Sequence, residues 1–156
     1  METEIIEKYY VQAVLPLGAD ESIILDFDKW TKFFSGLPIK QQVVYSVSIL
    51  DWQVNNGGLH QYFFNPYGIF SYATIPHLKR IGRLDFAELL NRAINIVNPY
   101  EEPEGIFLRE LFNRQVELIS DFDDSTGEML DKLDDHYYQL NENNHILKAL
   151  AKYLDQ

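Results

Sequence analysis

The segment at residues 40–54 is apolar on most of its circumference when it is wound as an α-helix. Its apolar residues follow the helical period in one line, which further apolar residues widen on both sides: Val43, Val47, Leu50 and Val54, then Val44, Ile49 and Trp52. A helix with so wide an apolar surface belongs inside a protein, because any large exposed face would leave that surface in water. The segment therefore predicts the central helix of a helical bundle.

A corner rich in amides and glycines follows this helix directly. Asn and Gly tolerate the left-handed conformation found past helix C-termini, so Asn55 to Gly58 should end the central helix. A second short helix is expected at residues 59–64, before a turn with the sequence NPYG. Side-chain amides in such places usually cap helix ends. We therefore interpret the corner residues as a structural motif: Asn55, Asn56, Gly57, Gly58, Gln61 and Asn65.

The rest of the chain repeats the helical period between turn residues. Helices are expected at residues 5–13, 23–34, 74–82, 85–97, 106–122, 125–140 and 146–154. The first should stop before Pro16, Thr74 is a predicted N-cap, and Ser125 with Glu128 is a predicted capping box. Asn143 or Asn144 is expected to cap the last helix. No repeat or linker divides the chain, so residues 1–156 are predicted to form one all-α domain, a bundle of about seven helices.

The charge of the chain is polarised. The net charge is -11, and residues 101–135 alone carry twelve acids and three bases. Contacts to phosphate need Lys and Arg, so direct binding to nucleic acid is not expected, and an acidic membrane surface would repel the chain. The chain has no cysteine, no basic segment near its start and no apolar run of about 20 residues. We therefore expect a cytoplasmic protein whose partners are basic.

Six acids within this block recur at alternating intervals of four and three residues. They are Glu117, Asp121, Asp124, Glu128, Asp131 and Asp135. Residues at these intervals lie on one face of a helix, so the carboxylates form a row that can stand in for the phosphates of duplex DNA. The alternative is that the row is only the solvated face of amphipathic helices. A break is expected at residues 125–127, which would divide the row in two.

The sequence contains no recognisable catalytic or metal-binding motif. Its four histidines do not form a helical metalloprotease pair, and neither a phosphate-binding glycine loop nor a nucleophile elbow occurs. His136 beside Asp134 and Asp135 is a poor ligand set, because consecutive residues of a helix point in different directions. His60, in the corner, is the better candidate for chemistry. We expect no enzymatic activity, no metal and no cofactor.

The corner motif resembles the signature of the DNA-mimic-protein domain family. The resemblance rests on Asn55 to Gly58, Gln61, the pair Phe63 and Phe64, and Asn65, and weaker matches extend it to about residues 40–156: LKRIG, AELLNRA and LDKLDDHYY. It implies a helical fold able to form homodimers. In the members that gave the family its name, an acidic surface imitates the DNA backbone and occupies a DNA-binding protein. The resemblance implies no catalytic role for the motif residues.

The leading hypothesis is therefore a non-enzymatic acidic interaction protein, a DNA mimic that occupies the basic surface of a DNA-binding protein. One alternative is a small-ligand or metal-binding domain centred on the corner between Asn55 and Asn65. Another is an immunity-like or structural module that binds a protein through exposed tyrosines.

Overall fold

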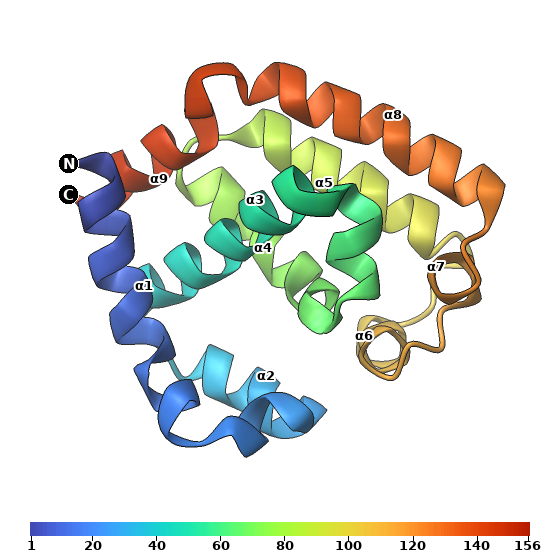
Figure 1. Cartoon of the computed structure of the whole chain (residues 1–156), viewed down its shortest axis with the longest axis horizontal. Coiled ribbons are helices and arrows are strands. Elements are labelled where there is room, and N and C mark those ends of the chain that lie inside the picture. The colour runs from blue at the N-terminus through green and yellow to red at the C-terminus, as the bar shows by residue number, and fades with distance from the viewer.

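The computed structural model describes residues 1–156 and contains helices and no strand (Figure 1). In chain order the elements are α1 (Glu2–Ala19), η1 (Glu21–Leu25), α2 (Phe27–Ser35), α3 (Ile39–Phe64), η2 (Pro66–Phe70), α4 (Ser71–Arg80), α5 (Leu84–Val97), α6 (Glu104–Phe112), α7 (Glu117–Ser120), α8 (Asp124–Leu140), η3 (Glu142–Asn144) and α9 (His145–Leu154). The prediction of an all-α domain is confirmed.

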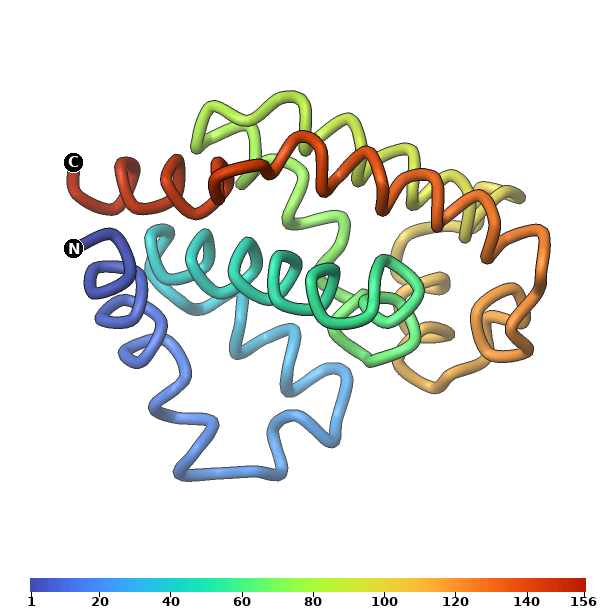
Figure 2. Tube along the Cα trace, turned by 45° about the horizontal axis from the view of Figure 1, so that its top comes forward, coloured from blue at the N-terminus to red at the C-terminus, as the bar shows by residue number.

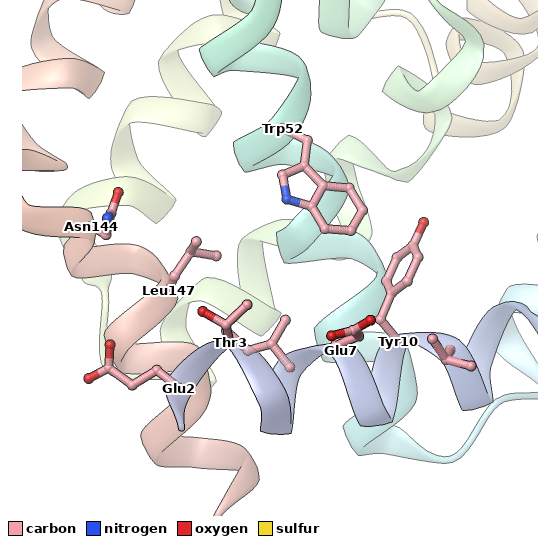
Figure 3. A pocket seen from close by; sticks show the side chains of 9 residues that line it. Glu2, Thr3, Glu7, Tyr10, Trp52, Asn144 and Leu147 are labelled. Atoms are coloured by element: carbon pink, nitrogen blue, oxygen red, sulfur yellow. The ribbon is translucent and has the colours of Figure 1, made fainter.

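Helix α3 lies at the centre of the molecule, as its wide apolar surface predicts. Every residue from Val43 to Asp51 is buried. The helices α1, α4, α8 and α9 all contact it, and Figure 2 shows it running beneath α8 and α9. Trp52 directly follows this buried stretch, but 45 % of its surface is exposed, on the side toward α1 (Figure 3).

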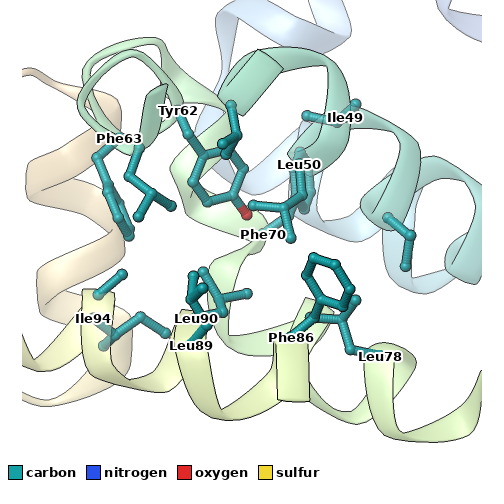
Figure 4. Packing of buried hydrophobic residues seen from close by; sticks show 14 of the residues in the cluster. Ile49, Leu50, Tyr62, Phe63, Phe70, Leu78, Phe86, Leu89, Leu90 and Ile94 are labelled. Carbon is teal, nitrogen blue, oxygen red and sulfur yellow. The ribbon is translucent and has the colours of Figure 1, made fainter. Parts of the chain in front are cut away.

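The two glycines interrupt α3 where the sequence predicts a corner. Gly57 (φ −151°, ψ 19°) and Gly58 (φ 76°, ψ −176°) are not helical, and they separate a long first part of α3 from a short second part. The second part carries Tyr62 and Phe63, which are fully buried and lie against Leu90 and its neighbours on α5 (Figure 4). The corner thus turns the chain so that both parts of α3 contribute to one core.

Two predicted helix ends were wrong near prolines. Helix α1 continues through Pro16 to Ala19, although proline lacks the N–H that an interior helical position needs. The N–H of Asp20 closes the last turn on the carbonyl of Pro16 at 3.1 Å. Thr74 is not an N-cap but lies inside α4, buried, where its hydroxyl donates to the carbonyl of Phe70 at 2.7 Å. The predicted end of that helix is correct, since Gly82 (φ 79°) directly follows its C-cap residue.

The single helix predicted at residues 106–122 was also wrong. Helix α6 ends at Phe112 in a Schellman motif, in which the N–H of Gln115 donates to the carbonyl of Glu110 at 2.8 Å. Arg114 (φ 55°) occupies the left-handed position that glycine usually takes. The break lets the one-turn helix α7 fold back and bury Ile119.

The start of α8 differs from the prediction as well. No break occurs at residues 125–127, which form the first turn of α8. The N-cap is Asp123 rather than Ser125, because its carboxylate accepts the N–H of Thr126 at 2.8 Å. The chain instead turns at Phe122 (φ 53°), between α7 and α8. At the other end of the chain, Asn144 precedes α9 but makes no side-chain cap.

Candidate functional site

The structure exposes all six acids of the predicted row. We call them the acidic face: Glu117, Asp121, Asp124, Glu128, Asp131 and Asp135. The last four lie along one side of α8, whereas Glu117 opens α7 and Asp121 directly follows it. Lys132 is the only base between residues 115 and 135. The structure therefore brings four of the six acids into one row and places the other two on the preceding turn.

The opposite side of α8 holds the helix to the core. Leu130, Leu133 and Tyr137 are buried there, and α8 contacts both α3 and α5. Phe86 of α5 meets the ring of Tyr137 edge-on at 5.0 Å between centroids. Because this side is anchored, the acids on the other side are held at fixed spacing along a rigid helix.

Asp134 has a structural role that the sequence pattern does not reveal. Its buried carboxylate accepts the N–H of Leu59 at 2.8 Å, and so it caps the second part of α3 from a different helix. Burial raises the pKa of Asp134 to about 6, against the opposing effect of that hydrogen bond. A Cβ on Gly58 would collide with the same carboxylate. The glycine is thus needed both for its backbone angles and for the close approach of α8.

A second buried carboxylate fixes α8 to the first part of α3. Asp51 accepts the hydroxyl of Tyr137 at 2.6 Å and the amide N–H of Asn141 at 3.1 Å. Tyr138 donates to the backbone carbonyl of Val54 at 2.8 Å. Burial raises the pKa of Asp51, and its hydrogen bonds oppose the rise. The corner and the LDDHYY segment therefore form one interlocked structure.

The amides of the corner bond mainly to one another. Gln53 accepts one hydrogen bond from Gln61 and another from Asn65, each at 2.9 Å. Asn56 donates to Gln61 at 3.1 Å, and this bond crosses the two glycines. Asn55 is exposed. These bonds join Gln53, Asn56, Gln61 and Asn65 in one network.

The interlocked corner and α8 lie inside the segment that a known family covers. The family model of DMP19-like protein matches residues 35–156. The chain belongs to this family. Helix α1, η1 and nearly all of α2 precede the matched segment. A search of curated proteins and a search of solved structures each found no match.

The DMP19-like segment also carries a cluster of aromatic rings beside the acidic face. The ring of His60 stacks on Phe122 at 4.8 Å and on Phe64 at 5.9 Å, and its Nε2 lies 3.1 Å from the carbonyl oxygen of Ile119. The guanidinium of Arg114 lies over the ring of Phe64, 4.8 Å from its centroid. Phe122 remains 62 % exposed. His60 thus holds α7 and its acids in place.

The other histidines do not assemble a reactive centre. His77 and Ser46 are paired at 2.8 Å between Nδ1 and Oγ, yet both are buried. Burial lowers the pKa of His77 to about 4, so its ring is neutral near pH 7. His136 lies 3.1 Å from a guanidinium nitrogen of Arg92. No group of three or more acids, histidines and cysteines could hold a metal ion.

None of the helices combines the length and apolarity needed to cross a membrane.

Proposed function

We propose that this DMP19-like protein is a non-enzymatic interaction protein whose acidic face occupies the basic, DNA-contacting surface of a DNA-binding protein. The observation that carries the proposal is the exposed row of carboxylates on α8, anchored from behind by buried residues of the same helix. Membership of the family supports it, since the family is named for this mode of action.

The dimensions of the row are compatible with imitation of one DNA strand. Asp124 and Asp135 are eleven residues apart, which corresponds to roughly 16 Å along a helix. One strand of duplex DNA presents a phosphate about every 3.4 Å of axis, or roughly five over that length. The row supplies four carboxylates over the same length, and Glu117 and Asp121 lie on the turn that precedes it. A basic surface that contacts successive phosphates would therefore meet a similar density of charge.

Phe122 adds an apolar contact at the end of the row. Asp121 and Asp123 are its neighbours in the sequence, and its exposed ring stacks on His60. Aromatic side chains often provide much of the binding energy of protein interfaces. Phe122 would give the surface a contact that nucleic acid does not supply, so a partner that binds here would distinguish the protein from DNA.

The experiment is capture of partners from a cell lysate, followed by competition with duplex DNA. The wild-type protein should retain a DNA-binding protein, release it as salt rises, and lose it to added duplex. The test variant reverses Asp121, Asp124 and Asp131 to Lys. The matched control reverses three exposed acids outside the acidic face, Glu4, Glu21 and Glu88, and so changes the net charge equally.

We expect the test variant to lose the partner and the control to keep it. If both variants capture the partner as well as the wild type does, the acidic face is not the binding surface. If the partner binds the protein and duplex DNA at the same time, in one complex of all three, the protein binds it at a surface other than its DNA-contacting one, and mimicry is excluded.

A further inference from the structure

A pocket of about 440 Å³ lies between α1, α3 and α9, at the opposite end of the molecule from α7 (Figures 1 and 3). Its walls come from these three helices and from the end of η3: Glu2, Thr3, Ile6, Glu7, Tyr10, Val11, Trp52, Asn144 and Leu147. The volume lies within the range of pockets that hold small molecules. The part contributed by α1 precedes residue 35, so the family match does not cover it.

Two aromatic rings form one corner of this pocket. Trp52 extends from α3 toward α1, and Tyr10 rises from α1 to meet it (Figure 3). The ring centroids are 4.8 Å apart, and the planes are inclined by 71°. Such an edge-to-face pair presents two ring surfaces at a steep angle to one another. Trp52 leaves 45 % of its surface exposed on a helix whose preceding nine residues are all buried.

The charge around the aromatic corner is of one sign. Glu2 and Glu7 line the pocket, and none of its nine residues is Lys or Arg. Ile6, Val11 and Leu147 supply the apolar floor and rim. Ring faces and carboxylates both attract a positive charge, because the π-electrons give a ring a negative face. An anion would be repelled by both.

We infer that this pocket binds a small organic cation that has an apolar body, such as an aromatic quaternary ammonium. The ammonium group would lie between the aromatic corner and Glu7, and the apolar body would contact Ile6 and Leu147. This site is independent of the proposed function, because it shares no residue with the acidic face.

Benzyltrimethylammonium is the probe, with benzyl alcohol and benzoate as its neutral and anionic counterparts. The full-length protein is titrated with each, and binding is followed by calorimetry and by the NMR signal of the Trp52 indole N–H. We expect the cation to bind in the millimolar range or tighter and to shift the indole signal. Both counterparts should bind at least tenfold more weakly.

Three variants locate the cation. Trp52→Ala should reduce its affinity at least tenfold, and Glu7→Gln should reduce it severalfold without removing any apolar contact. Glu88→Gln, which neutralises an exposed glutamate on α5, is the matched control and should leave the affinity unchanged.

Three results would overturn the inference. One is the absence of any shift of the indole signal at high cation concentration. Another is equal binding of benzyl alcohol, which would make the pocket merely apolar. The third is an equal loss of affinity in Glu7→Gln and Glu88→Gln, which would mean that only the overall charge of the protein attracts the probe.

Discussion

Gly58 and Gly82 both have positive φ angles, yet they differ in their surroundings. A Cβ on Gly82 would meet nothing within 4 Å, whereas a Cβ on Gly58 would collide with the carboxylate of Asp134. Gly58 also has φ and ψ values that are essentially restricted to glycine, at a cost of about 1–3 kcal/mol for other residues. We expect Gly58→Ala to lower the free energy of unfolding by at least about 2 kcal/mol more than Gly82→Ala does. Urea denaturation of both variants measures this difference, and equal losses would contradict the role given to Asp134.

The buried carboxylate of Asp134 should make stability depend on pH. Its pKa is about 6 in the folded protein and about 4 in the unfolded chain, so the folded state holds the proton more tightly. The resulting stability is fully present below pH 4 and is lost as pH rises through 6. Between pH 5 and 7.5 the wild type should therefore lose about 1 kcal/mol relative to Asp134→Asn, which keeps an acceptor for the N–H of Leu59. Urea titrations of both proteins at the two pH values test this, and parallel curves would show that the carboxylate does not titrate in this range.

At the scale of whole elements, the sequence predicts those helices whose buried apolar residues recur at the helical period. The apolar lines of α3 and α5 are continuous, and both helices lie close to where the pattern places them. The break between α6 and α7 cannot be read from the sequence, because Arg114 takes a left-handed conformation in which a glycine is usually found. The cap of Leu59 by Asp134 joins residues 75 positions apart. Contacts of this kind depend on how the helices pack against one another, so they cannot be predicted from the periodicity of one segment.

The position of α7 should depend on His60. This side chain stacks on Phe122 and reaches the carbonyl of Ile119, so it holds the C-terminal end of the short helix and the turn that follows. His60→Ala should raise the hydrogen-exchange rates of amides in residues 117–123 about tenfold, with a loss of about 1 kcal/mol in global stability. His145→Ala, at an exposed position on α9, is the control and should leave these rates unchanged. Unchanged rates in His60→Ala would mean that α7 is held by the burial of Ile119 alone.

At the scale of the molecule, the residues that hold the fold together and those that carry the proposed function are different. The corner and its buried partners hold α3 to α8, whereas the acidic face lies on the outer side of α8. We therefore expect that the acids can be replaced while the interlocked core keeps its contacts. This separation is what makes the charge-reversal experiment interpretable, because loss of binding need not mean loss of fold.

The first 34 residues lie outside the family match, but they complete the core of this chain. Trp30 donates its indole N–H to the hydroxyl of Tyr45 at 3.0 Å, and Phe34 meets Phe70 at 4.8 Å between ring centroids. Both side chains are buried, so removing residues 1–34 would expose the apolar surface that they cover. We expect this deletion to abolish most of the cooperative unfolding transition and to create binding sites for the dye ANS.

A deletion of residues 1–19 alone should have a smaller effect. It removes α1 but keeps α2, and with it Trp30 and Phe34. Thermal unfolding followed by circular dichroism, with ANS fluorescence measured in parallel, ranks the three proteins. If residues 35–156 unfold at the same temperature as the full chain and bind no dye, α2 only covers the surface of an independent unit. If instead the shorter deletion is as damaging as the longer one, α1 provides the decisive contacts, through Ile6 and Ala13.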